Sequence, residues 1–238
     1  IIKNGPGERR RFLDLELCQL DKIYMYHLTN YNKTLAQRNY LLKQISLDRN
    51  LLDTLYIWDS KLVEHGSVII NTRNSFIKKI NELIYSIHNK LTGGKEELIL
   101  KYEPNVRTED FEDKLKDSLE RDLMLKMTNV GPHRDDMCFL FNNIDIRKYG
   151  SQGQQRTSAL SLKLAEIQLV KEIIKDNPVL LLDDVLSELD RNRQNHLLDS
   201  IGDIQTIVTC TGLEEFINHR FTYNKIFHVV KGTVVCEN

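Results

Sequence analysis

The chain has 238 residues, of which 41% are hydrophobic and 28% charged, and its formal net charge at pH 7 is −1. This composition is typical of a globular protein with one or two domains and excludes an intrinsically disordered chain. No apolar run approaches the roughly 18 residues of a membrane span, so we expect no membrane partner.

The chain begins with IIKNGPGERRR, which lacks an initiator Met and the regions of a secretory signal. We therefore expect a piece of a longer, cytoplasmic polypeptide. The cysteines are scattered and form no CxxC pair, which favours reduced thiols over a disulfide framework or a zinc site. They are Cys18, Cys138, Cys210 and Cys236.

Charge is unevenly distributed. Residues 1–95 carry 15 Lys and Arg against 9 Asp and Glu, a surplus of six, whereas residues 96–125 carry 5 against 10. A basic, elongated segment is compatible with a polyanionic partner such as nucleic acid. A solvated helical face is the commoner explanation, so charge alone does not decide between the two.

Two long helical patterns open the chain. Residues 8–48 repeat apolar side chains at spacings of three and four, which predicts one long helix whose stripe contains a single polar member, Arg38. A second run over residues 51–92 ends at Gly93 and Gly94, a glycine stop. Because the link between the runs is short, we expect an antiparallel pair of helices, the arm of a helical domain spanning residues 1–125.

After Gly94 the spacing of apolar residues is no longer that of a long helix. Residues 97–103 are strand-like, the acidic segment up to Asp122 is predicted to be helical, and residues 137–146 are predicted to form a hairpin turning at Asn142 and Asn143. Strands at 178–182 and 205–209 alternate with helices after Ser151 and near 191–201 and 213–217, before a final hairpin over 225–236. This alternation predicts an α/β unit with a largely parallel sheet.

Two carboxylates follow the most apolar strand. Asp183 and Asp184 come directly after VLLL, and a strand without polar residues is typical of a parallel sheet covered on both faces. Open α/β sheets bind ligands at the carboxyl ends of their strands, where Mg²⁺ commonly joins one or two carboxylates to phosphate oxygens. The alternative is that Asp184 only caps the loop toward the next helix, for which Asp190 is a natural N-cap.

The helix after Ser151 begins with SQGQQR, a turn with nothing apolar to bury. Ser151 and Gln154 have the spacing of a capping box, which is enough to start the helix. A capping box does not explain Gly153, because glycine inside a helix costs about 1 kcal/mol relative to alanine. A first turn without that side chain lets an anion, above all phosphate, approach the amides at the positive end of the helix dipole.

Three stretches together resemble one family. They are VGPHRDD at 130–136, YGSQGQQR at 149–156 and LLLDDVLSELD at 180–190. The last two resemble the signature and Walker B motifs of ABC-type ATPase heads. All three, with residues 9–14, 31–33 and 37–39, resemble the RecF family of bacterial DNA replication and repair proteins. The resemblance covers essentially the whole chain. It implies an α/β second lobe of an ABC-type ATPase head over residues 126–238, joined to the helical arm.

The resemblance also implies roles at the end of the apolar strand. Asp183 would hold Mg²⁺ through water, and Asp184 would orient or deprotonate the water that attacks the γ-phosphate. Thr211 is the candidate for the switch position after the strand at 205–209. The stretch 130–136 receives no role, since an ordinary tight turn accounts for it as well as a contact with nucleotide or DNA does.

Further roles concern a second subunit. Ser151 and Gly153, with Gln154, would contact the γ-phosphate of ATP bound to the partner subunit. Ser187 and Asp190 would form the D-loop across the dimer.

No P-loop, G-x-x-x-x-G-K-[ST], occurs in the chain, and in the RecF family it lies on an N-terminal lobe. The resemblance implies that only the complete protein uses ATP and Mg²⁺, as a slow, DNA-stimulated ATPase, and that this chain alone is inactive. It implies an ATP-dependent homodimer that binds double-stranded and gapped DNA with recombination mediator proteins, in repair, replication restart and the SOS response to DNA damage. The alternative is a non-catalytic helical scaffold that uses no nucleotide.

Overall fold

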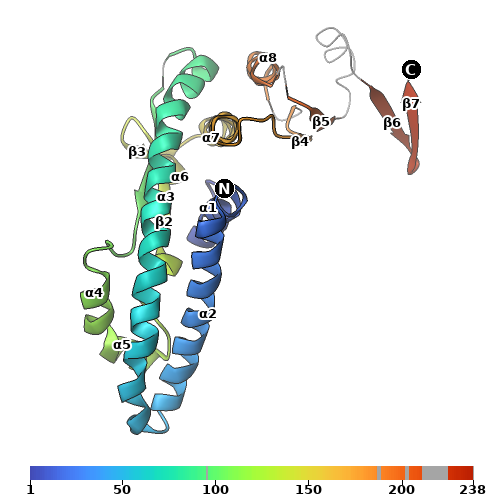
Figure 1. The fold of residues 1–238 in the computed structure, drawn as a ribbon. Coiled ribbons are helices and arrows are strands. Elements are labelled where there is room, and N and C mark those ends of the chain that lie inside the picture. The colour runs from blue at the N-terminus through green and yellow to red at the C-terminus, as the bar shows by residue number, and fades with distance from the viewer. Residues whose placement is uncertain (95, 187–188, 202–203, 211–224, 238) are drawn as a thin grey trace. The chain divides into compact units, whose positions relative to one another are not determined.

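The structure, a computed structural model, describes residues 1–94, 96–186, 189–201, 204–210 and 225–237 (Figure 1). The chain divides into two compact units, residues 1–176 and 177–238. This boundary lies well after residue 125, because segments that follow residue 125 share a core with the long helices. The functional division at residue 125 stays a prediction.

The first unit opens with two helices, α1 (Pro6–Leu20) and α2 (Lys22–Ile45). The prediction of one helix over residues 8–48 is therefore wrong. Asp21 has extended backbone angles, and its side chain accepts hydrogen bonds from the amides of Ile23 and Tyr24. An aspartate that satisfies the first amides of a new helix is an N-cap, so the chain restarts there although the apolar spacing continues.

A short 3₁₀ helix, η1 (Arg49–Thr54), leads into α3 (Leu55–Thr92), the longest helix. Helix α3 lies along α2 in the antiparallel arrangement predicted for the arm (Figure 1). It ends as predicted, because Gly93 adopts a left-handed φ of 68° at the C-cap.

The first sheet is antiparallel, with strands in the order β1 (Leu98–Glu103), β2 (Asp136–Phe141) and β3 (Ile144–Asp145). Asn142 and Asn143 have φ values of 46° and 65°, which a two-residue hairpin turn requires and asparagine tolerates. Between β1 and β2 the acidic segment forms α4 (Phe111–Asp117) and α5 (Leu119–Leu125), followed by the short 3₁₀ turn η2 (Pro132–Arg134). Helix α6 (Ile146–Tyr149) comes directly after β3.

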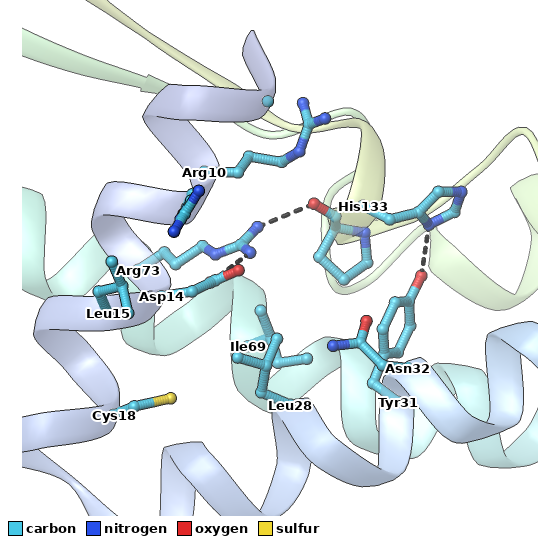
Figure 2. A pocket seen from close by; sticks show the side chains of 13 residues that line it. Arg10, Asp14, Leu15, Cys18, Leu28, Tyr31, Asn32, Ile69, Arg73 and His133 are labelled. Carbon is cyan, nitrogen blue, oxygen red and sulfur yellow. Dashed lines mark hydrogen bonds and ion pairs between the residues drawn. The ribbon is translucent and has the colours of Figure 1, made fainter. Parts of the chain in front are cut away.

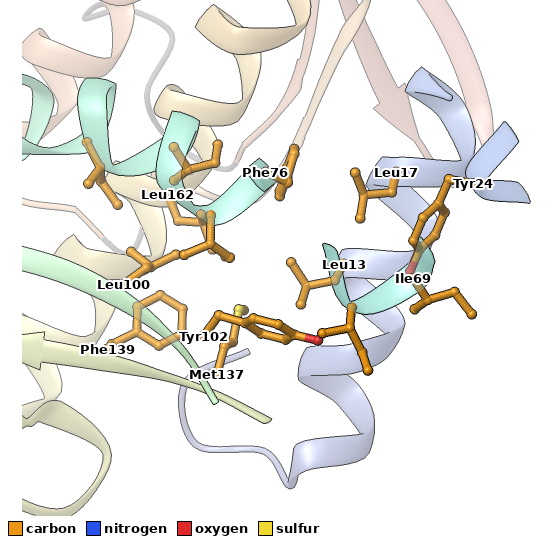
Figure 3. Packing of buried hydrophobic residues seen from close by; sticks show 14 of the residues in the cluster. Leu13, Leu17, Tyr24, Ile69, Phe76, Leu100, Tyr102, Met137, Phe139 and Leu162 are labelled. Carbon is orange, nitrogen blue, oxygen red and sulfur yellow. The ribbon is translucent and has the colours of Figure 1, made fainter. Parts of the chain in front are cut away.

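One hydrophobic core joins these elements to helix α7 (Gln152–Ile174). Figure 3 shows Leu13, Tyr24 and Ile69 of the helices together with Tyr102 of β1 and Met137 of β2. Helix α7 contributes an apolar set to the same core: Leu162, Ala165 and Leu169. The first turn of α7 is therefore held by a helix that packs on α3.

Glycine permits one close approach in this core. A Cβ atom on Gly66 of α3 would lie 2.5 Å from Cε1 of Phe111 and 3.0 Å from Cε2 of Tyr31. Helix α4 can thus place Phe111, which is fully buried, directly against the backbone of α3.

The second unit contains β4 (Leu180–Asp183), α8 (Arg191–Ser200), β5 (Thr206–Thr209), β6 (Ile226–Val230) and β7 (Thr233–Glu237). Strands β4 and β5 are parallel, and β6 and β7 are antiparallel. The α/β class is confirmed, and the strands predicted at 178–182 and 205–209 pair in parallel as β4 and β5, but the described strands form three small sheets and not one largely parallel sheet. Strands joined by two-residue turns, at 142–143 and at 231–232, can only pair antiparallel. The helix predicted near 213–217 lies outside the described residues.

None of the helices in the described ranges has both the length and the apolar character that a membrane span needs.

Candidate functional site

The first turn of α7 has the capping box that the sequence predicts. The amide of Gln154 donates to Oγ of Ser151 at 3.2 Å, and the amide of Ser151 donates to Oε1 of Gln154 at 2.9 Å. Two of the amides that a helix leaves unsatisfied at its start are thereby used. Ser151 is exposed, and its hydroxyl retains its own hydrogen to donate to an anion.

The residues just before this turn are held by hydrogen bonds from Gln155. Nε2 of the buried Gln155 donates to the carbonyls of Ile146, at 3.1 Å, and Gly150, at 3.2 Å. A Cβ atom on Gly150 would lie 2.6 Å from the carbonyl oxygen of Ile146, so position 150 requires glycine. Sequence reasoning missed both residues, and the signal was their place beside Ser151 in YGSQGQQR.

The side chain of Gln154 makes a second contact. Its Nε2 donates to Oε1 of Glu96 at 3.4 Å. Both ends of the Gln154 amide are thus engaged within the chain, while Ser151 and Gly153 form the rest of the turn. Glu96 was not a predicted site residue, because nothing in its local sequence connects it to a helix that begins more than fifty residues later.

The two predicted carboxylates follow β4 as expected. Asp183 is the register partner of Thr209 on β5, and the Thr209 hydroxyl donates to Oδ1 of Asp183 at 2.5 Å. The amide of Asp184 donates to the carbonyl of Thr209 at 3.0 Å and to its Oγ1 at 3.1 Å. Thr209 therefore holds both residues in place. It is a functional candidate that sequence reasoning passed over in favour of Thr211, which lies outside the described residues.

Asp184 has a left-handed backbone with a φ of 52°. Such a conformation is uncommon for residues other than glycine and costs of order 1 kcal/mol or more. The two hydrogen bonds from the Asp184 amide to Thr209 stabilise this conformation. The bend turns the chain sharply at the carboxyl end of β4, where both aspartates are exposed.

The donor set suits a cation that keeps much of its water. Asp183 and Asp184 supply carboxylate oxygens, and no cluster of three or more His, Cys, Asp or Glu ligands occurs within the described part of the chain. Mg²⁺ is commonly held by one or two carboxylates together with waters and substrate phosphates. The residues present fit Mg²⁺ in this form and not a closed site made of protein ligands alone.

The remaining predicted positions lie on the segment after β4. Asp190 caps α8 as predicted, accepting a hydrogen bond from the amide of Arg193 at 3.0 Å. The carbonyl of the buried Leu186 accepts from Nε2 of Gln194 at 2.8 Å, which ties this segment to α8. Ser187 lies outside the described residues. The roles predicted for these residues, and for those of the first turn of α7, stay predictions.

The stretch 130–136, which the sequence left without a role, forms the centre of a buried ion-pair network. Arg73 of α3 donates to Oδ2 of Asp135 at 2.9 Å and to Oδ1 of Asp14 at 2.7 Å. Arg9 of α1 forms a bidentate pair with Asp136, at 2.6 and 2.9 Å. These contacts join α1 and α3 to the start of β2, and Figure 2 shows Arg73 reaching between Asp14 and the η2 turn.

The turn itself requires glycine and a neutral histidine. Gly131 has a φ of 134°, and a Cβ atom there would collide with the hydroxyl of Tyr31. Nε2 of His133 lies 3.0 Å from the carbonyl of Thr128, and Nδ1 lies 2.7 Å from the Tyr31 hydroxyl (Figure 2). Burial lowers the pKa of His133 to about 4. In the neutral ring Nε2 therefore donates to the carbonyl and Nδ1 accepts from Tyr31.

A cavity of about 450 Å³ lies beside the turn, with Arg10, Asn32 and His133 among its lining residues (Figure 2). Nη1 of Arg10 donates to the carbonyl of Asp135 at 2.7 Å. The 130–136 stretch is thus a structural junction whose residues are largely committed to partners within the chain.

The chain is similar to curated RecF proteins. It is 65% identical, over 98% of its length, to the DNA replication and repair protein RecF of Lachnoclostridium phytofermentans, and 63% identical, over 98%, to that of Agathobacter rectalis. The chain belongs to the RecF family. This confirms the resemblance inferred from the three motifs. The chain spans 65% of the length of each of these two RecF proteins.

Solved structures agree with this assignment. A structure of the recombination mediator protein RecF with ATP, from the RecFOR pathway, is 38% identical and superposes with a TM-score of 0.89, covering 100% of this chain and 65% of that one. The head domain of Smc from Pyrococcus furiosus, bound to the C-terminal domain of ScpA, is 18% identical with a TM-score of 0.51 over 99% of this chain and 58% of that one, which shows a shared fold alone. No protein-family model matches the chain.

Proposed function

We propose that this chain is part of an ATP-dependent DNA-binding protein of recombinational repair and replication restart, which acts at single-strand gaps. ATP would join two ATPase heads into a homodimer, and hydrolysis would release it. The names of the RecF relatives, which include DNA replication and repair, ATP and the RecFOR pathway, support this proposal. The partners would be double-stranded and gapped DNA and recombination mediator proteins.

The observation that carries the catalytic part of the proposal is the contact of Thr209 with both aspartates. Asp183 would hold Mg²⁺ through water, and the cation would neutralise charge on the phosphates of ATP. Asp184 would orient the attacking water or accept its proton. The Thr209 hydroxyl, 2.5 Å from Asp183, fixes the carboxylate that this arrangement needs.

The second half of the site would come from another copy of the protein. Ser151 and Gly153, at the start of α7, would face the γ-phosphate of ATP bound to the partner subunit, with Gln154 orienting the turn. The exposed Ser151 hydroxyl and the positive end of the helix dipole support this role. Asp190, with Ser187, would form the D-loop.

The proposed ATPase is slow, stimulated by DNA and confined to the complete protein. The chain has no P-loop sequence, so we expect it alone neither to bind nor to hydrolyse ATP. Contacts with DNA would be mainly to phosphates, and the affinity for DNA should therefore fall steeply with salt concentration.

The test uses the complete protein and the variant Asp184→Asn. We expect the variant to form the ATP-dependent dimer, measured by analytical ultracentrifugation, and to lose hydrolysis, measured as phosphate release with gapped DNA. Asp53→Asn, an exposed aspartate of η1, is the matched control and should match the wild type in both assays. An Asp184→Asn protein that stays monomeric with ATP, or that hydrolyses at the wild-type rate, would contradict the role of Asp184.

A second variant tests the contact in trans. Ser151→Arg places a long side chain at the start of α7 and should prevent ATP-dependent dimerisation without changing the ATP affinity of the monomer. If Ser151→Arg and Asp184→Asn both behave as wild type, the nucleotide roles fail and the scaffold alternative takes their place.

A further inference from the structure

A polar chain connects the first turn of α7 to the end of α3. Nε2 of Gln154 donates to Oε1 of Glu96 at 3.4 Å, and the other carboxylate oxygen of Glu96 lies 3.5 Å from Nε2 of His88. Nδ1 of His88 lies 2.8 Å from Oγ of Ser161, about two turns further along α7 than Gln154. This series of side-chain contacts therefore runs from Gln154 of α7 through Glu96 to His88 of α3, and from His88 back to α7 at Ser161.

The return path reaches Gly153. The Ser161 hydroxyl donates to the carbonyl of Thr157 at 2.9 Å, and the Thr157 hydroxyl donates to the carbonyl of Gly153 at 2.8 Å. Because the single hydroxyl hydrogen of Ser161 goes to that carbonyl, Nδ1 of His88 is the donor in its contact with Ser161. The contact of Nε2 with Glu96 is therefore attractive when the ring carries a hydrogen on both nitrogens, as an ion pair. His88, Thr157 and Ser161 are fully buried, so these contacts are made away from water, where polar groups without partners are costly.

Elsewhere α7 meets the rest of the unit mainly through apolar side chains. Leu162, Ala165 and Leu169 share the core with Ile80 and Ile84 of α3. Apolar packing holds the two helices together but does not fix the rotamer of a polar residue at the exposed end of α7. Glu96 fixes the rotamer of Gln154. The capping box uses the oxygen of the Gln154 amide, and Glu96 accepts a hydrogen bond from its nitrogen.

We propose that Glu96 and His88 are positioning residues for the first turn of α7, through which the arm helix α3 sets the orientation of Ser151 and Gly153. This inference rests on the proposed contact of that turn with ATP on a partner subunit. A change in the orientation of the last turn of α3 would then alter ATP-dependent dimerisation without touching the monomer's own nucleotide site.

The test compares three variants in the complete protein. Glu96→Ala removes the acceptor, Glu96→Gln keeps an oxygen that accepts from Gln154, and Glu97→Ala is the matched control, since Glu97 is exposed and its described hydrogen bonds with Asn142 use only its backbone. Two quantities are measured for each: the protein concentration for half-maximal dimerisation at saturating ATP, and the affinity of the monomer for a fluorescent ATP analogue.

Loss of one charge-assisted hydrogen bond should weaken ATP-dependent dimerisation by about tenfold in Glu96→Ala. Glu96→Gln should recover most of this loss, Glu97→Ala should match the wild type, and the monomer's ATP affinity should stay constant throughout. A Glu96→Ala protein that dimerises like the wild type would overturn the proposal. So would a loss that Glu96→Gln does not recover, or one accompanied by an equal loss of ATP affinity, because either would indicate a general structural defect.

His88 is probed in the same assays by His88→Gln and by the double variant His88→Gln/Glu96→Ala. Substitutions of residues that act through the same series of contacts should have non-additive effects. The double variant should therefore dimerise no more weakly than Glu96→Ala alone. His88 is fully buried, so His88→Gln can fail to fold. Glu96 is partly exposed, and Glu96→Ala tests the proposal in that case. If Ser151→Arg leaves dimerisation intact, the proposed contact of Ser151 in trans fails, and this inference fails with it. If Ser151→Arg prevents dimerisation and Glu96→Ala does not weaken it, only this inference fails.

Discussion

The guanidinium of Arg38 lies 2.6 Å from the carboxylate of Asp122, and neither side chain is exposed. Nε of Arg38 donates to Asp59 at 2.6 Å, and Nη1 also donates to the Thr128 hydroxyl at 2.9 Å. One side chain of α2 thereby connects α3, α5 and the segment that follows α5. A buried cation of this kind is stable only while its partners remain in place.

Arg38→Met should therefore strongly destabilise the chain. It leaves Asp122 buried and Asp59 largely buried without their cation, and removing one partner of a buried ion pair costs about 3–5 kcal/mol. The free energy of unfolding in urea measures the loss. Arg11→Met, the same change at an exposed arginine of α1, should stay within about 0.5 kcal/mol of the wild type. A loss below about 1 kcal/mol in Arg38→Met would show that the network contributes little.

The neutral His133 predicts a dependence of stability on pH. Its pKa is lowered to about 4 by burial, whereas an unfolded histidine titrates near 6.5. The unfolded chain therefore binds the proton first, and the stability present above about pH 6.5 is lost as the pH falls toward 4. Between pH 7 and 5 this loss should be on the order of 2 kcal/mol. The comparison is with His133→Gln, whose free energy of unfolding should fall less over the same range; parallel curves would contradict the assignment.

Glu166 of α7 predicts the opposite dependence. Burial, together with a hydrogen bond to Glu16, raises its pKa to about 8, despite Lys163 at 2.9 Å. The folded state then holds a proton that the unfolded glutamate releases near pH 4.5, so this contribution to stability is lost as the pH rises from about 4.5 to 8. Glu166→Gln cannot ionise, and its stability relative to the wild type should rise by about 3.5 kcal/mol between pH 5 and 8. Glu172→Gln, at an exposed position of α7, should show no such trend.

Thr209→Val tests the contact that holds the two aspartates. In the complete protein the variant loses the donor to Asp183 and one of the two acceptors for the Asp184 amide. We expect DNA-stimulated phosphate release to fall by about tenfold, the effect of about 1.4 kcal/mol on the barrier. Thr206→Val, on the same strand, removes a hydroxyl whose hydrogen bond within the described residues goes to the carbonyl of Ile204, and should have little effect. Equal rates in the two variants would show that Thr209 does not act through the aspartates.

Features decided by neighbours in the sequence were predictable. The capping box at Ser151, the turn at Asn142 and Asn143, the stop at Gly93 and the N-cap at Asp190 each follow from local hydrogen bonds or backbone preferences. The break at Asp21 has an equally local cause, but the apolar spacing that continues through it concealed the cap.

Features decided by distant partners were not predictable. Arg38 stood out as the polar member of an apolar stripe, yet Asp122, its buried partner, is 84 residues away. Asp135 and Asp136 were recognised only by resemblance, because the arginines that neutralise them come from helices that lie 62 and 127 residues earlier in the sequence. Nor does any local pattern pair Glu96 with Gln154. Such contacts depend on how the elements pack, which one sequence does not state.

The left-handed backbone at Asp184 bears on which amino acids evolution can place there. Residues other than glycine adopt this conformation rarely, and asparagine and aspartate do so several times more often than most others. A glutamate at position 184 would gain reach but meet a greater conformational penalty. RecF lineages that share this bend should therefore vary among aspartate, asparagine and glycine at position 184, and a change to glutamate should accompany a relaxed turn.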